Sequence, residues 1–198
     1  MSGGKRLFDI LASAAGLLVL SPVFLAVAAA IKLQSPGPVF FRQERVGRGG
    51  APFRIWKFRT MVTDAEQQGG ALTVGEDPRI TPLGRVLRRY KLDELTQLLN
   101  VLRGEMSMVG PRPEVAKYVA AYSAEERRVL DLVPGVTDPA SLEYRNEAAV
   151  LAARADPERA YVQEIAPHKI RLNLEYAGRA TRRSDLGIIL KTIAHLGR

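Results

Sequence analysis

The stretch ILASAAGLLVLSPVFLAVAAAI occupies residues 10–31 and contains no ionisable side chain. As a single helix it would be roughly 33 Å long at about 1.5 Å per residue, which is enough to cross the hydrocarbon core of a bilayer. Lys5 and Arg6 precede it and Lys32 follows it, so positive charge at both ends gives no clean orientation. The stretch predicts a membrane-associated helix near the N-terminus.

Three topologies fit this stretch. The basic start and the three alanines at 28–30 imitate a secretory signal peptide with its cleavage site, and the length alone would permit a helix that spans the bilayer. Ser21 and Pro22 suggest a third topology, a re-entrant hairpin, because proline lacks an N–H and clashes with the preceding turn. The serine hydroxyl would satisfy a carbonyl that the proline frees. The break alone does not choose among the three.

The chain as a whole is basic. Its 198 residues include 29 Lys and Arg against 21 Asp and Glu, a net charge of +8, so its partners are expected to be anionic. Nucleic acid, anionic lipid and nucleotide phosphates all qualify. The absence of cysteine excludes a disulfide scaffold, a thiolate nucleophile and a cysteine zinc site.

The pattern predicts an α+β fold that is mostly helical, with residues 1–34 as the membrane segment and residues 35–198 as one domain. A small β-hairpin is expected around the glycine-rich turn at 47–50, because apolar residues flank it on both sides. In the second strand, Lys57 and Arg59 are two positions apart and would share a face.

Two helices are expected at 83–90 and 95–102, where leucines recur at helical spacing. Their apolar stripes are out of phase, which is explained if one helix ends and another begins near Lys91. Asp93 would then cap the N-terminus of the second helix. Ser184 is expected to cap a last helix, which would pack on the core or lie on a membrane surface.

Asp93 and Glu94 are adjacent carboxylates in a stretch dense with cations. Phosphoryl chemistry requires such a set, because basic groups hold phosphates while carboxylates bind Mg²⁺ or attack phosphorus. A solvated basic face with an ordinary helix-capping acid fits the same residues. The cations are Lys57, Arg59, Arg79, Arg85, Arg88, Arg89, Lys91 and Arg112.

The sequence Gly110, Pro111, Arg112, Pro113, Glu114 places an arginine between two prolines. The prolines fix φ and remove N–H donors, so the guanidinium would be presented from a stiff, extended loop. Arginine in such a loop can grip a phosphate with two hydrogen bonds or stack on a base. A plain structural turn fits the same pattern.

Together these motifs resemble the bacterial monotopic phosphoglycosyl transferases, also called bacterial sugar transferases. The resemblance covers roughly residues 5 to 136 in consistent order. It is carried by KRLFD at 5–9, the Ser21 and Pro22 break, FRQERVG at 41–47, KFRTM at 57–61, residues 85–100 and MVGPRPE at 108–114.

The resemblance implies transfer of a sugar 1-phosphate from a UDP-sugar to a polyprenol (undecaprenyl) phosphate, with release of UMP. By analogy Asp93 attacks the β-phosphorus and carries a covalent phosphosugar, while Glu94 helps to place Mg²⁺ as a metal ligand with Asp93. The acceptor phosphate then attacks that intermediate in the second step of a ping-pong reaction. Such a reaction opens the assembly of a surface glycan.

The resemblance also implies places for the other residues. Arg88 is expected near the polyprenol phosphate, and Arg112, between Pro111 and Pro113, near the nucleotide. Two further residues, Lys57 and Arg59, are expected to contact the diphosphate. The re-entrant helix with its Ser21 and Pro22 break would enter and leave on the cytoplasmic side of the bacterial inner membrane, with amphipathic helices at the lipid interface. Residues 35–198 would be the cytoplasmic catalytic domain, with inner-membrane lipid but no nucleic acid as partner, and a homodimer is compatible with this.

The chain departs from the family pattern at two places. Thr96 stands where the family usually has proline, which should change local stiffness more than chemistry. Residues 138–147, DPASLEYRNE, replace a usual glycine and tryptophan, so the resemblance names no sugar. The residues alone leave open a membrane-tethered basic module that binds nucleic acid or anionic lipid, and a protein secreted after residue 30.

Overall fold

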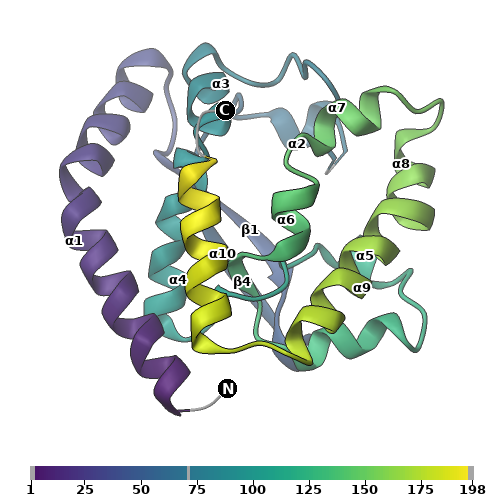
Figure 1. Ribbon diagram of the computed structural model, residues 1–198. Helices are drawn as coiled ribbons and strands as arrows, with labels where there is room; N and C mark the ends of the chain where they lie inside the picture. Colours follow the sequence, from purple (N-terminus) through teal and green to yellow (C-terminus); the bar gives the residue numbers. More distant parts are fainter. Residues whose placement is uncertain (1–2, 71, 196–198) are drawn as a thin grey trace.

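The structure is a computed structural model that describes residues 3–70 and 72–195 (Figure 1). The outermost residues of the two predicted parts, 1–2 and 196–198, lie outside the described residues. Most of the described chain is helical, and its strands form two small two-stranded sheets, as the α+β expectation requires.

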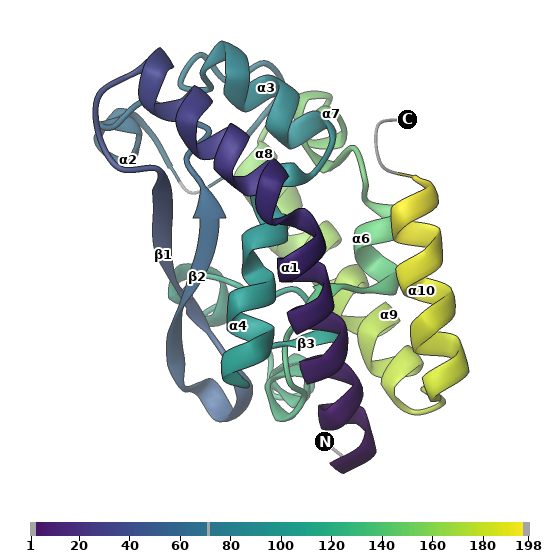
Figure 2. The same cartoon turned by 90° about the vertical axis from the view of Figure 1, so that its left-hand side faces the viewer.

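The apolar stretch lies within α1 (Gly3–Gln34), a helix with Pro22 in its interior. The helix runs unbroken through Ser21 and Pro22, while its axis changes direction along its length (Figure 2). Proline cannot donate to the carbonyl of Leu18 four residues earlier. The Ser21 hydroxyl donates to that carbonyl instead, at 2.8 Å, which is the compensation expected from the sequence.

The two faces of α1 differ sharply. Leu18, Leu25 and Leu33 on the outer face are 76%, 72% and 89% exposed. On the inner face, Val27 and Ile31 are buried in one core cluster with Phe58 and Leu87. Within the described residues, α1 is the one helix long and apolar enough to cross a membrane. Its outer face therefore offers a continuous apolar surface, while its inner face is part of the domain core.

The predicted hairpin is present. Strands β1 (Phe40–Val46) and β2 (Pro52–Phe58) pair antiparallel, with Phe41 opposite Lys57. The connecting turn is the short 3₁₀ segment η1 (Arg48–Gly50), in which Gly49 has φ 68° and Gly50 φ 81°, values that favour glycine. The hairpin is fastened to the next layer by Asn100, whose side chain accepts from the Trp56 N–H and donates to the Arg54 carbonyl, each at 2.9 Å.

The predicted interruption of helix between the two leucine-rich segments is confirmed. Helix α3 (Pro82–Arg89) ends before Lys91, which adopts a left-handed conformation at φ 53°, and the 3₁₀ helix η2 (Leu92–Gln97) leads into α4 (Leu98–Arg103). The expected N-cap role of Asp93 is wrong. Lys91 occupies the N-cap of η2, and Asp93 lies inside the 3₁₀ turn, because the left-handed residue starts the turn two positions earlier than the carboxylate.

A second, parallel pair of strands was not expected from the sequence. Strand β3 (Ser107–Val109) pairs with β4 (Gly135–Thr137). The two segments approach each other closely beside the paired strands, since a Cβ on Gly135 would lie 2.1 Å from the Gly110 nitrogen. This contact anchors the loop that carries Arg112.

Most of the remaining helices lie on the side of the molecule away from α1 (Figure 1). The last helix begins at Arg182 rather than near Ser184, because Thr181 is its N-cap and Ser184 completes a capping box from inside the helix. Its side nearest α1 is joined to that helix by the ion pair between Lys5 and Asp185. The remaining helices are α2 (Ala65–Gln68), α5 (Ala116–Val119), η3 (Glu126–Asp131), α6 (Pro139–Glu143), α7 (Glu147–Ala152), α8 (Pro157–Ala160), the π-helical turn η4 (Tyr161–Ile165), α9 (Ala166–Ala177) and the last helix, α10 (Arg182–Ala194).

Candidate active site

A cavity of about 1530 Å³ lies at the centre of these elements. One part of its wall is charged and includes the adjacent carboxylates Asp93 and Glu94. Another part is apolar and comes from the inner face of α1, where Ala12, Gly16 and Leu20 line the same space. The cavity therefore joins a charged pocket to the helix that carries the apolar outer surface.

Asp93 is a buried charged group of this wall with an unsatisfied oxygen. Its side chain is buried at 5% exposure, and its Oδ1 has no hydrogen-bond partner among residues 3–70 and 72–195. Burial raises the pKa of Asp93, and the neighbouring charge of Glu94 raises it further. A buried carboxylate oxygen without a partner is energetically costly, which makes Asp93 a candidate for a reacting group rather than a structural one.

Glu94 has the opposite environment. Arg112 holds it with two hydrogen bonds, from Nη1 to Oε2 at 2.8 Å and from Nη2 to Oε1 at 2.5 Å, and Lys57 Nζ donates to Oε1 at 2.9 Å. Burial alone would raise the pKa of Glu94, but Arg112 and Lys57 hold that pKa well below its usual range. Glu94 is therefore ionised and fixed in place.

The two cations respond differently to the same carboxylate. Burial lowers the pKa of Lys57 to about 8, even though the charge of Glu94 opposes this shift. The charge of Glu94 raises the pKa of Arg112 well above its usual value despite burial. Lys57 can therefore change its protonation state near neutral pH, whereas Arg112 remains charged.

Arg88 reaches the same cavity from α3. Its Nε donates to the Thr60 hydroxyl at 2.8 Å and its Nη1 donates to the Thr73 hydroxyl at 3.0 Å. Burial lowers the pKa of Arg88, and the charges of Asp93 and Glu94 oppose that shift. The structure thus brings Arg88 into electrostatic range of both carboxylates.

Arg59 also lines the cavity, but its hydrogen bonds go elsewhere. It follows the end of β2 at Phe58, so Arg59 lies one residue beyond the strand that was expected to carry it with Lys57, although both residues line the cavity. Its guanidinium donates to the Pro36 carbonyl at 2.6 Å and to the carbonyl and hydroxyl of Ser35 at 3.0 and 2.8 Å. The structure therefore places Arg59 against the chain that leaves α1, and its diphosphate contact stays a prediction.

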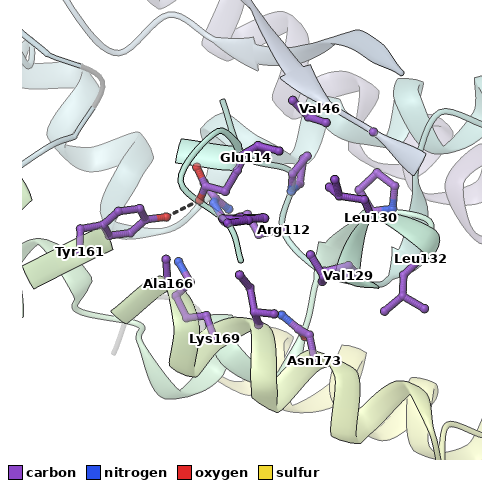
Figure 3. Close-up of a pocket in the computed structure, with 17 residues that line it drawn as sticks. Val46, Arg112, Glu114, Val129, Leu130, Leu132, Tyr161, Ala166, Lys169 and Asn173 are labelled. Carbon is purple, nitrogen blue, oxygen red and sulfur yellow. Dashed lines mark hydrogen bonds between the residues drawn. The ribbon is translucent and has the colours of Figure 1, made fainter. Parts of the chain in front are cut away.

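Residues from three other segments of the chain hold the loop around Arg112. The Pro111 carbonyl accepts from Gly135 N–H at 2.9 Å, and the Pro113 carbonyl accepts from Arg45 Nη1 at 3.1 Å. The Tyr161 hydroxyl donates to Glu114 in the wall of a smaller cavity of about 40 Å³ (Figure 3). These partners lie far from the loop in sequence, so no local pattern signalled them.

Asp93 and Glu94 are the residues to test as metal ligands. Groups of three or more acids or histidines suited to a metal are absent from the described residues. Mg²⁺ in nucleotide enzymes is commonly held by one or two carboxylates together with substrate phosphates, so a larger protein cage is not required. The unpartnered Oδ1 of Asp93 and the adjacent Glu94 carboxylate fit that mode of binding.

Comparison with known proteins adds to this geometry. The family described as bacterial sugar transferase matches residues 2–198. The chain belongs to that family. This confirms the resemblance, and membership makes the protein an enzyme of the transferase class.

Three curated relatives of this sugar transferase illustrate the match. A UDP-glucose:undecaprenyl-phosphate glucose-1-phosphate transferase of Caulobacter vibrioides is 40% identical over 97% of this chain and 69% of its own length. The Escherichia coli protein of the same name is 36% identical over 96% of this chain and 39% of its own length. A UDP-N-acetylgalactosamine-undecaprenyl-phosphate N-acetylgalactosaminephosphotransferase of Aeromonas hydrophila is 48% identical over 61% of this chain and 29% of its own length. The chain thus spans less than half of two of these relatives.

Proposed function

We propose that this sugar transferase moves a sugar 1-phosphate from a UDP-sugar to undecaprenyl phosphate and releases UMP. The names of the relatives support both substrates, because they pair a UDP-sugar with undecaprenyl phosphate. Other relatives are exopolysaccharide production proteins, which supports a role at the start of surface glycan assembly.

The observation that carries the mechanism is the contrast within the dyad. Asp93 has a buried oxygen with no partner in the described part of the chain, and Glu94 beside it is fixed by two cations. In the proposed first step, an Asp93 carboxylate oxygen attacks the β-phosphorus, the bond to the UMP oxygen breaks, and an acyl phosphate that links Asp93 to the phosphosugar forms. In the second step, a phosphate oxygen of the acceptor attacks the same phosphorus and frees Asp93. Two separate steps suit a soluble donor and a lipid acceptor.

Charge around the dyad supports the assignment of the other roles. Lys57, Arg88 and Arg112 line the cavity near Asp93 and would bind the phosphates of donor and acceptor. Asp93 and Glu94 would hold Mg²⁺ together with the donor phosphates. When bound there, the ion would supply positive charge that offsets the repulsion between Asp93 and the diphosphate.

Contacts at both ends of α1 support a re-entrant, monotopic placement on the cytoplasmic face of the inner membrane. Near its start, Arg6 donates to the Val101 carbonyl at 2.6 Å. Near its end, Val27 and Ile31 pack in the domain core. Both ends therefore contact the same domain, which favours a placement with both ends on one side of the bilayer. The apolar outer face would lie in lipid.

A two-stage incubation tests this function. Detergent-solubilised protein receives Mg²⁺ and a radiolabelled UDP-sugar without acceptor, and undecaprenyl phosphate is added only afterwards. We expect release of about one UMP per protein and a labelled adduct on Asp93 in the first stage, then transfer of the label to lipid. Release of UMP only after the acceptor is added, with no labelled protein, would refute the covalent route.

Labelling of introduced cysteines tests the placement of α1. The chain has no native cysteine, so Gly3→Cys and Gln34→Cys each supply a single reactive thiol at an exposed position. In oriented membrane vesicles, a membrane-impermeant maleimide should react with both from the same side. Reaction from opposite sides would mean that α1 spans the bilayer.

A further inference from the structure

An ion pair on the wall of the large cavity has no part in the mechanism above. Lys169 of α9 donates to Glu147, the first residue of α7, at 2.6 Å. Both residues line the cavity that contains Asp93. Lys169 is 8% exposed, whereas the Glu147 side chain is 28% exposed, so the carboxylate is the more accessible partner.

The pair shares the cavity wall with Arg112 and the dyad. Arg112 contacts Glu94 directly, and the charge of Glu147 is also among those that raise the pKa of Arg112. Lys169 Nζ is 5.5 Å from the centre of the Tyr161 ring. Figure 3 shows Lys169 on α9 facing the loop that carries Arg112. A donor whose phosphates lie between Asp93 and Arg112 would therefore extend a ring toward this pair.

Two other ion pairs of the C-terminal half differ in position. Those between Lys117 and Glu158 and between Arg154 and Glu164 are about half exposed, and none of their residues lines the cavity. Withdrawing two opposite charges from water is costly, so a largely buried pair on the wall of the cavity is a candidate for a binding role. The wall beside Glu147 carries the polar residues Ser141, Tyr144, Arg145 and Asn146, together with the apolar Leu142, Ala148, Ala149 and Ala152.

We propose that Glu147 and Lys169 form the subsite that reads the hydroxyl groups of a ring in the nucleotide-sugar donor. The inference rests on the proposed function. A carboxylate accepts and an ammonium donates, so together they match a vicinal diol, in which one hydroxyl can donate to the carboxylate and the other can accept from the ammonium. Such a diol occurs on the transferred hexose and on the ribose of the nucleotide, and the experiment distinguishes them. The pair also adjoins residues 138–147, where the chain departs from its family pattern.

The test measures steady-state kinetics of Glu147→Gln and Lys169→Met. Donors are UDP-glucose, UDP-galactose, their N-acetyl counterparts and a 2′-deoxyuridine analogue of the best donor. Glu164→Gln removes a carboxylate from an ion pair outside the cavity and serves as the matched control. Loss of a hydrogen bond between a charged group and a hydroxyl should lower kcat/KM for the best donor about 10- to 100-fold, chiefly through KM. The control should stay within about twofold.

The donor panel separates the two rings. If the pair reads the hexose, both variants lose discrimination among the four UDP-sugars. If it reads the ribose, both lose discrimination against the 2′-deoxy donor while their hexose preference is unchanged. Either result supports the subsite.

Lys169→Arg and thermal unfolding guard against a variant that merely misfolds. If Glu147→Gln and Lys169→Arg lower the unfolding temperature yet keep donor preference and KM, the pair is structural and the inference is wrong. A wild-type protein that releases UMP from no donor would instead refute the proposed function, so the two failures are distinguishable.

Discussion

Basic residues between positions 57 and 112 form two groups that differ in the partners they contact. Around the dyad, Lys57 and Arg112 direct their donors at the Glu94 carboxylate. On the loop that precedes α3, Arg79 forms an ion pair with Asp77 and donates its other hydrogen bonds to the backbone carbonyls of residues 65, 70 and 72. The first group faces a cavity beside an unpartnered carboxylate, and the second fastens a loop to itself.

The difference teaches that charge density in a sequence does not distinguish binding from scaffolding. A guanidinium has five N–H donors, and carbonyls of nearby loops can satisfy most of them. Arg79 is therefore a structural residue with some exposure to the cavity. Lys57 and Arg112 keep their charges available because their partner is an acid in the site itself. Variants in each group should separate the two roles.

The largest effect is expected on the acid that the cations surround. Asp93→Asn should lower kcat by at least about 10³-fold, because it removes the nucleophile. It should not lower stability. A carboxyl whose pKa is raised on folding binds its proton more tightly in the folded chain, so ionising it at neutral pH lowers the free energy of unfolding, and the neutral amide removes that cost. UMP release and thermal unfolding of the variant, side by side, measure both; near-normal turnover would disprove the assigned nucleophile.

Arg79→Ala should act on stability instead. Breaking a buried ion pair and its carbonyl contacts should lower the free energy of unfolding by about 3 kcal/mol. The exposed Arg128→Ala is the matched control and should stay within about 0.5 kcal/mol. Urea denaturation followed by circular dichroism gives both values. A stable Arg79 variant with a raised donor KM would move Arg79 into the substrate-binding group.

The pH dependence of kcat/KM should report the ionisation of the Lys57 ammonium group. With a pKa of about 8, its ammonium group loses its charge as the pH rises through that value, so phosphate binding should weaken on the alkaline side. We expect kcat/KM to fall about tenfold per pH unit above pH 8. In Lys57→Arg, whose side chain stays charged, this alkaline limb should shift upward by more than one unit. An unchanged limb would assign it to another group.

Arg59 tests the border between the two groups and should give the smallest effect. Its contacts with Ser35 and Pro36 predict that Arg59→Lys lowers the free energy of unfolding by about 1 kcal/mol and changes the donor KM less than about threefold. The same denaturation and kinetic measurements apply. A tenfold rise in donor KM at unchanged stability would support the diphosphate contact that the family resemblance implies.

Local patterns in the sequence were sufficient for much of the fold. Apolar runs around the turn at 47–50 predicted the hairpin, and out-of-phase leucines predicted the break at Lys91. The parallel pairing of β3 with β4 was missed, because it joins residues 28 positions apart through backbone bonds that leave no local pattern. The N-cap role expected for Asp93 failed because the left-handed turn at Lys91 shifts the helix start.

The sequence by itself determined the apolar N-terminal helix, the adjacent carboxylates Asp93 and Glu94, and the stiff loop around Arg112. These depend on composition, adjacency and proline geometry, which are local properties. Only the tertiary structure decided that Glu94 takes Lys57 and Arg112, that Asp93 is left with an unpartnered oxygen, and that a second ion pair reaches the same cavity. Which charges meet depends on how distant segments pack, and burial then sets what each charge can do.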